Sequence, residues 1–289
     1  MKSPRFKYVR PNSLDQAIGL LSEFGDEARV LAGGQSLMPT LNMRLSHPEI
    51  LIDINNLEDL KGISLQGDFV RIGALVRHVE VMESSVIREE LPLIAEAIPY
   101  VAHVAIRNRG TFGGSIALAD PAAEMPACAL ALNANFLLKG PRGTREIEAE
   151  KFFYGLYETA IEPDEILVAA LLPRIKSGEI FAFTELARRQ GDFAQAGVAC
   201  KARISGQIIE QIRLVYFGSE VKPTLGNNMM TVLKGQRWSD SLVESNSSQL
   251  DTDLDPIQNL HGSSSLKLHL QKVLTKRVVH AVMEKAGSI

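Results

Sequence analysis

Two short segments, AGGQS at residues 32–36 and TFGGS at residues 111–115, decide how the rest of this sequence is interpreted. Each has two consecutive glycines beside a hydroxyl side chain. Consecutive glycines let the backbone adopt conformations in which successive N–H groups converge on an anion. Neither segment matches a P-loop or a GxGxxG fingerprint. One such segment would more often be a simple turn, but two could clasp the two phosphoryl groups of a dinucleotide.

The sequence around these segments alternates strand and helix patterns. A Ser-x-x-Gln capping box at 13–16 opens a helix, and Gly25 ends it. Gly-Pro-Arg-Gly at 140–143 predicts a hairpin turn. Further elements are expected as strands at 28–32, 50–54, 69–75 and 165–173, and as helices at 91–101 and 122–132.

After a linker at 175–179 the apolar period changes to two, which predicts an antiparallel sheet. Its strands are expected at 180–187, 196–204 and 208–218, and an amphipathic helix at 266–283 closes the chain. The predicted fold class is α+β, with one domain at 1–175, divided into subdomains at about 1–55 and 56–175, and a second at 180–286.

Composition excludes several classes of function. The 289 residues carry a formal net charge of −3 with both signs interspersed, so nucleic acid is not an expected partner. No signal peptide or apolar stretch near the ~20 residues of a membrane span is visible, so we expect a soluble, cytoplasmic protein. Cys128 and Cys200 lie in apolar runs and are too few to hold an iron–sulfur cluster. The sequence therefore predicts no metal site in this chain.

Two further groups of residues have both functional and structural interpretations. Asp120 and Glu124 are four residues apart, so they either contact a dinucleotide or cap a helix with Pro121 at its first position. The segment RRQGDFA at 188–194 either places charges near a flavin ring or is a hairpin turn. From the residues alone the hairpin is favoured.

Other noticeable side chains are given structural roles. His103 lacks an acidic or nucleophilic neighbour in the sequence, so we interpret it as structural. The aromatic residues Phe152, Phe153, Tyr154 and Tyr157 are expected to pack in the core. Trp238 is isolated in a polar stretch and is assigned no role.

Four stretches of the sequence, which include both glycine segments, together resemble one known protein family. The stretches at 32–45, 106–127, 183–199 and 261–282 resemble the flavoprotein, or medium, subunits of the xanthine dehydrogenase and carbon monoxide dehydrogenase family of molybdenum hydroxylases. This resemblance implies a two-subdomain FAD-binding domain of the PCMH-like type, followed by the family's small sheet-plus-helix C-terminal domain. It also implies that catalytic residues for the substrate lie on another chain.

The resemblance implies a set of FAD-binding residues. The pyrophosphate is expected between the first segment (Ala32, Gly33, Gly34, Gln35, Ser36 and Leu37) and the second (Thr111, Gly113, Gly114 and Ser115). Asp120 and Glu124 are expected near the adenosine half. Phe183 is expected beside the isoalloxazine ring, with Arg188 and Asp192 near its edge.

The resemblance also implies partners. These are a large subunit with molybdopterin cytosine dinucleotide and a small subunit with two [2Fe–2S] clusters, assembled as a dimer of heterotrimers. Electrons would pass through the clusters to FAD and on to an external acceptor. Two alternatives stay open from the sequence: a stand-alone FAD-dependent oxidoreductase, and an interaction module that kept the fold but lost FAD.

Overall fold

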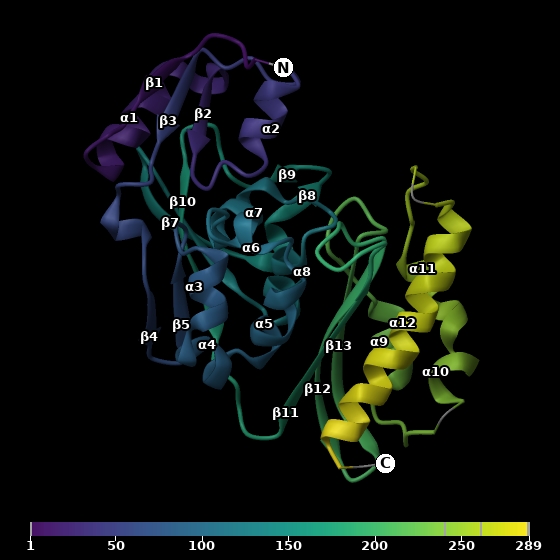
Figure 1. Cartoon of the computed structure of the whole chain (residues 1–289). Coiled ribbons are helices and arrows are strands. Elements are labelled where there is room, and N and C mark those ends of the chain that lie inside the picture. The colour runs from purple at the N-terminus through teal and green to yellow at the C-terminus, as the bar shows by residue number, and fades with distance from the viewer. Residues whose placement is uncertain (1, 240, 261, 288–289) are drawn as a thin grey trace.

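The computed structural model describes residues 2–239, 241–260 and 262–287. Figure 1 shows a small N-terminal sheet, a central helix-rich part on a second sheet, and a C-terminal sheet backed by a long helix. The mixed α+β fold class predicted from the sequence is confirmed.

The N-terminal sheet is parallel, with strand order β1-β3-β2. Its short apolar strands pair in register, with Leu31 opposite Asp53. Helix α1 begins after Ser13, whose Oγ accepts from the N–H of Gln16 at 3.2 Å, as the capping box predicts. The Gln16 amide reaches back one residue further than expected, to the N–H of Asn12. The elements are β1 Lys7–Val9, α1 Leu14–Phe24, β2 Ala28–Leu31, α2 Leu37–Asn42 and β3 Ile50–Asp53.

The second sheet is antiparallel, with strand order β4-β5-β10-β6-β7. Gly140 and Gly143 face each other at the predicted hairpin turn. The central strand β10 is almost entirely apolar, because β5 and β6 flank it and helices cover it. The strands are β4 Ile63–Gln66, β5 Phe69–Gly73, β6 Asn135–Gly140, β7 Gly143–Glu148 and β10 Ile166–Pro173.

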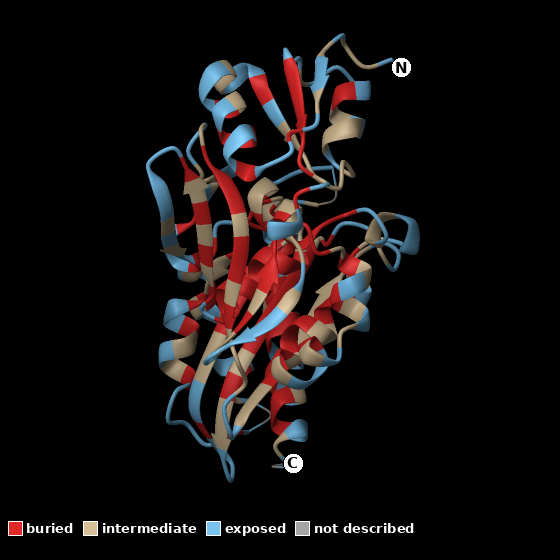
Figure 2. Ribbon diagram, turned by 90° about the vertical axis from the view of Figure 1, so that its left-hand side faces the viewer, coloured by how far each residue is buried: buried red, intermediate tan, exposed pale blue. Residues whose placement is uncertain are grey.

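Short helices fill the space between the second and third sheets. Figure 2 shows the buried residues concentrated in this middle part and the exposed ones along the outer loops. The helices are α3 His78–Glu83, α4 Ser85–Glu90, α5 Pro92–Ala97, α6 Val104–Arg107, α7 Phe112–Leu118 and α8 Glu124–Ala131. A small hairpin, β8 Phe153–Gly155 and β9 Glu158–Thr159, follows the β6–β7 hairpin in the chain.

The predicted aromatic core in this region is half correct. Phe152 and Phe153 are buried and pack with Phe136. Tyr154 and Tyr157, in contrast, are 56% and 55% exposed, so the prediction that they pack in the core is wrong.

The C-terminal sheet is antiparallel, with strand order β11-β12-β13-β14. One face, including Phe181 and Phe217, joins the core formed by α5 and α8, and the other packs under α12. Trp238, given no role from the sequence, is buried in this second core beside His280. The elements are β11 Glu179–Leu186, β12 Ala196–Ser205, β13 Ile208–Phe217, β14 Thr224–Leu225, α9 Asn227–Leu233, α10 Leu242–Ser245, α11 Leu250–Asp253 and α12 Ser264–Lys285.

Single 3₁₀ turns complete the order of elements, at Gly25–Glu27, Glu58–Leu60, Ile98–Tyr100, Ala149–Lys151 and Ser247–Gln249. Cys128 and Cys200 are both buried free thiols, as their apolar surroundings predict. In the part of the chain that the structure describes, none of the helices has both the length and the apolarity to span a bilayer.

Candidate dinucleotide-binding site

The first glycine segment forms the loop between β2 and α2. Gly34 has a φ of 71°, the left-handed region that favours glycine, and this turns the chain into the helix. The Gln35 amide donates to the Gly33 carbonyl at 2.9 Å. Among the described residues, none accepts a hydrogen bond from the five successive N–H groups of residues 33–37. A row of free backbone donors is suited to an anionic ligand.

The second glycine segment differs from its prediction. Gly113, Gly114 and Ser115 lie in the first turn of α7 and not in a loop, and Thr111 is the N-cap. Their N–H groups donate to Ala74 O, Thr111 Oγ1 and Thr111 O, so they are not free to converge on an anion. In this segment the N–H of Thr111 is the donor without an acceptor among the described residues.

The two segments nevertheless lie against each other. A Cβ added to Gly33 would stand 2.5 Å from the Arg109 carbonyl oxygen and 2.8 Å from Gly110 Cα. Only a residue without a side chain permits this approach. A Cβ on Gly114, in contrast, would meet only the Thr111 side chain within 4 Å, so this side of α7 is open.

A polar bridge that the sequence analysis missed joins the two segments. The Asn55 amide donates to the Ala32 carbonyl at 2.8 Å and accepts from the Arg77 guanidinium at 2.5 Å. Arg77 also donates to the Arg109 carbonyl. Asn55 follows β3, the parallel neighbour of β2. Parallel strands end at the same edge of a sheet, so the place of Asn55 directly after a strand could have predicted from the sequence that it lies near the first glycine segment.

The third segment, between β11 and β12, is a long hairpin connection whose tip contacts the helical region. Gly191 has a φ of 80°, and a Cβ there would lie 2.5 Å from the Ala102 carbonyl oxygen and 2.8 Å from His103 Nδ1. Arg188 and Asp192 are exposed. Gly33 thus approaches residues 109–110, and Gly191 approaches residues 102–103.

The Phe183 side chain is not exposed beside the β11–β12 connection. It is half-buried on β11, with its ring 5.2 Å from Tyr100 and 5.6 Å from Phe217, centroid to centroid. These contacts fix it in the interface between the central helices and the C-terminal sheet.

The predicted carboxylates take positions that differ from a simple helix cap. Helix α8 begins at Glu124, and Asp120 closes a turn before it by accepting from the Ala122 N–H at 2.9 Å. The interpretation of Asp120-Pro121 as the helix start is therefore wrong. Burial, with a smaller contribution from the Asp120 charge, raises the pKa of Glu124 to about 7.

A fourth carboxyl group, Glu185 on β11, was missed by the sequence analysis. Burial and the neighbouring Glu124 raise its pKa to about 8, so the carboxyl group of Glu185 is mostly protonated at neutral pH. Its Oε2 is buried without a hydrogen-bond partner in the described structure. Such an oxygen can serve a hydroxyl or N–H of a ligand.

These features fit an FAD molecule better than they fit a metal. The free N–H groups of residues 33–37 suit a pyrophosphate, and the open side of Gly114 leaves room beside it. Within residues 2–239, 241–260 and 262–287, no three His, Cys, Asp or Glu side chains gather as metal ligands would.

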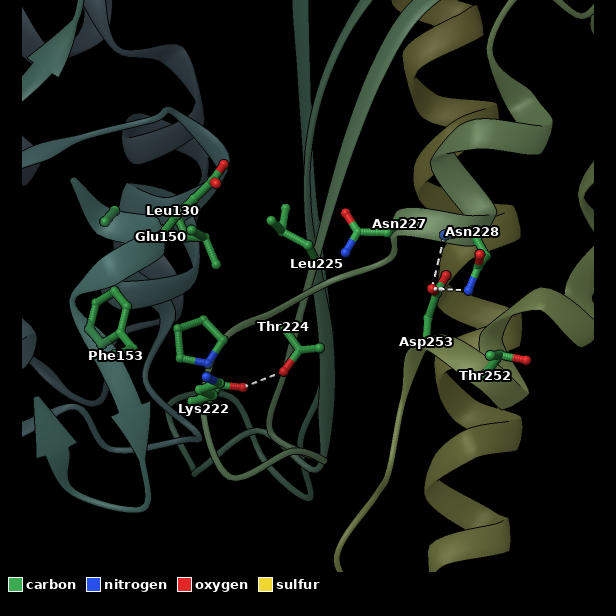
Figure 3. Close-up of a pocket in the computed structure, with 12 residues that line it drawn as sticks. Leu130, Glu150, Phe153, Lys222, Thr224, Leu225, Asn227, Asn228, Thr252 and Asp253 are labelled. Carbon is green, nitrogen blue, oxygen red and sulfur yellow. Dashed lines mark hydrogen bonds between the residues drawn. The ribbon is translucent and has the colours of Figure 1, made fainter.

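A pocket of about 410 Å³ lies elsewhere, between the end of α8 and the β13–α9 region (Figure 3). No residue of the glycine segments lines it. Its carboxylates are already used, because Glu150 pairs with Arg213 at 2.5 Å and Asp253 accepts from the Asn228 and Met229 N–H groups at 2.9 Å. We therefore do not assign the dinucleotide to this pocket.

Comparison with known proteins identifies both halves of the chain. Residues 4–175 match the family of FAD binding domains in molybdopterin dehydrogenase, and residues 181–282 match the CO dehydrogenase flavoprotein C-terminal domain. The carbon monoxide dehydrogenase medium chain of Hydrogenophaga pseudoflava is 36% identical over 99% of this chain and 100% of its own length. The nicotine 6-hydroxylase medium subunit of Paenarthrobacter nicotinovorans is 36% identical over 96% of this chain and 98% of its own.

Solved structures agree with these relatives. Carbon monoxide dehydrogenase from Hydrogenophaga pseudoflava matches with a TM-score of 0.95 at 35% identity, covering 98% of this chain and 99% of that one. Quinoline 2-oxidoreductase from Pseudomonas putida 86 matches with a TM-score of 0.94 at 34% identity, covering 99% of both chains. The chain therefore belongs to the FAD-binding medium subunits of the xanthine dehydrogenase and carbon monoxide dehydrogenase family of molybdenum hydroxylases.

Proposed function

We propose that this chain holds FAD with its pyrophosphate against Ala32, Gly33, Gly34, Gln35, Ser36 and Leu37 on one side and Thr111, Gly113, Gly114 and Ser115 on the other. The five successive N–H groups without acceptors at residues 33–37 are the observation that carries this proposal. Backbone dipoles can hold a pyrophosphate without a lysine where water is partly excluded.

The second segment contributes in a different way from the first. Thr111 offers its free N–H, while Gly113 and Gly114 keep α7 close to Ala74 and free of side chains on the ligand side. Asp120 and Glu124 are proposed as neighbours of the dinucleotide, Arg188 and Asp192 as charged groups at the edge of the isoalloxazine ring, and Phe183 as an aromatic neighbour of that ring.

We further propose that the chain passes electrons within a larger complex. The residues of this chain would hold FAD, and the bound FAD would supply a redox centre able to take electrons from two [2Fe–2S] clusters of a small partner subunit and give them to an external acceptor. A large partner subunit would hold molybdopterin cytosine dinucleotide and transform the substrate. The relatives named medium chain or medium subunit support this division of labour. A dimer of heterotrimers in the cytoplasm is the proposed assembly.

This chain's own residues serve to bind and insulate the cofactor. Asn55 and Arg77 fix the distance between the glycine segments, and Gly191 brings the β11–β12 loop against residues 102–103. We place the boundary between the FAD-binding part and the C-terminal part in the linker at 175–179, and the site uses both parts.

The test is to co-express the chain with its genomic neighbours, purify the assembly, and measure its visible spectrum, released flavin, iron and molybdenum. We expect about one FAD per chain together with iron and molybdenum subunits. FAD without partners, with turnover of a small substrate, would favour a stand-alone flavoenzyme. A folded chain without flavin would refute the FAD proposal.

A further inference from the structure

The tip of the β8–β9 hairpin exposes an unusual cluster of large side chains. Tyr154, Leu156 and Tyr157 are each more than half exposed, although aromatic side chains are normally buried in large part. Tyr157 also has a φ of 56°, the left-handed region that bulky L-residues rarely adopt. Strained backbone of this kind gathers at ligand sites, where the surrounding structure holds it in place.

A specific contact orients Tyr157. Its hydroxyl donates to Asp120 Oδ2 at 3.4 Å, while the other Asp120 oxygen accepts from the Ala122 N–H at 2.9 Å. One Asp120 oxygen is thus fixed by the backbone of its own turn, and the other accepts the hydrogen bond from the Tyr157 hydroxyl. The ring keeps an open face, as an aromatic platform for a planar ligand requires.

The surroundings of Asp120 indicate which part of the site Tyr157 borders. The next residue, Pro121, accepts at its carbonyl from the Gly218 N–H at 2.8 Å. A Cβ on Gly218 would be 2.8 Å from the Ala194 carbonyl oxygen, and Ala194 lies two residues after Asp192. The hairpin is therefore linked by a short series of contacts to the loop proposed at the ring edge. Figure 1 shows β8 and β9 beside α7, between the N-terminal sheet and this loop.

From these contacts we infer that Tyr157 packs against the isoalloxazine ring of FAD, with Asp120 as the residue that positions it. This rests on the proposed function and deepens it, because it moves Asp120 from the adenosine half to the ring half of the cofactor. Leu156 widens the same apolar surface. Tyr154, on the same hairpin, has neither the Asp120 contact nor a positive φ, so it provides a matched control.

The experiment uses the full chain, freed of flavin and reconstituted with FAD. Tyrosine is electron-rich and quenches flavin emission on contact, whereas leucine and phenylalanine do not. Tyr157→Leu is expected to raise the emission of bound FAD severalfold and to weaken FAD affinity by roughly three- to tenfold, the range of one aromatic contact. Tyr157→Phe is expected to raise emission while keeping affinity near that of the wild type. Tyr154→Leu is expected to change neither.

Three other results would each overturn either this inference or the proposed function. Weaker affinity in Tyr157→Leu with unchanged emission and an unchanged visible absorption band would place the tyrosine away from the ring and overturn the inference. Unchanged affinity and emission in both Tyr157 variants, with thermal unfolding like that of the wild type, would overturn it as well. If the wild-type chain binds no FAD at all, the proposed function itself fails, which is a distinguishable result.

Discussion

Replacing Gly33 by alanine tests the contact between the two glycine segments most directly. The new Cβ would lie 2.5 Å from the Arg109 carbonyl oxygen, and ordinary van der Waals contact begins at 3.4 Å. The two segments would therefore have to separate by about 0.9 Å. Backbone atoms on both sides resist this movement, and overpacking of this kind costs roughly 1–3 kcal/mol.

The same displacement affects the cofactor. An N–H group that moves by most of an ångström leaves hydrogen-bonding range, and a bond to a charged acceptor contributes about 1.5–3 kcal/mol. Loss of one such bond predicts an FAD affinity about ten- to a hundredfold weaker, together with a lower melting temperature by a few degrees.

The assay is a fluorescence titration of the flavin-free full chain with FAD, combined with thermal unfolding. Gly19→Ala is the control, since no atom lies within 4 Å of its Cβ position in α1. Alanine there should raise the free energy of unfolding by about 0.5–1 kcal/mol and leave FAD affinity unchanged. Wild-type affinity and stability in Gly33→Ala would show that the segments can part without consequence, and would refute the reasoning.

The other predictions concern neighbouring parts of the fold. Gly113→Ala should destabilise the chain more than Gly114→Ala in urea unfolding, because its Cβ meets Ala74 backbone at 2.5 Å while that of Gly114 meets only the Thr111 hydroxyl; equal effects would contradict this. Arg145→Met should lower the free energy of unfolding by about 2–3 kcal/mol in the same assay. The reason is that the buried Glu165 carboxylate loses the partner that donates two hydrogen bonds to it, each at 2.7 Å. Adding Glu165→Leu should restore part of this free energy. For His78, burial lowers the pKa to about 4, so between about pH 6.5 and 4 the unfolded chain binds a proton that the folded chain does not. The His78 contribution to stability should therefore fall as pH drops through this window, by up to about 3 kcal/mol, so the wild type should lose stability relative to His78→Leu over this range; parallel pH profiles would exclude the explanation.

Features encoded locally were predictable from the sequence. The Ser13 cap, the hairpin turn at 140–143 and the period-two strands of the C-terminal sheet depend on residues close together in the chain. The second glycine segment shows where local reasoning fails. Glycines are poor helix formers, so the sequence predicted free N–H groups that converge on an anion, but the Thr111 cap and the close packing of Gly113 on Ala74 impose a helix.

Polar contacts between distant segments could not be predicted. Asn55 and Arg77 are 22 residues apart, and only the folded chain brings them between the glycine segments. Helix α12 is a second example, because its buried face includes polar residues that a prediction from the apolar pattern would place on the exposed face. Gln271 donates to the Phe217 carbonyl at 3.0 Å and to Ser219 at 2.8 Å, and Thr275 meets the Tyr216 hydroxyl at 3.0 Å.

The contacts of Gly33 and Gly191 have the same physical basis. At each, the missing side chain lets two backbones approach so closely that a Cβ would stand 2.5 Å from a carbonyl oxygen. One contact joins the N-terminal sheet to residues 109–110, and the other joins the C-terminal sheet to residues 102–103. A cofactor bound along residues 102–115 would therefore lie close to three layers of the fold, the N-terminal sheet, the central helices and the C-terminal sheet. Because a ligand stabilises the state that binds it, FAD should stabilise the packing of all three layers together.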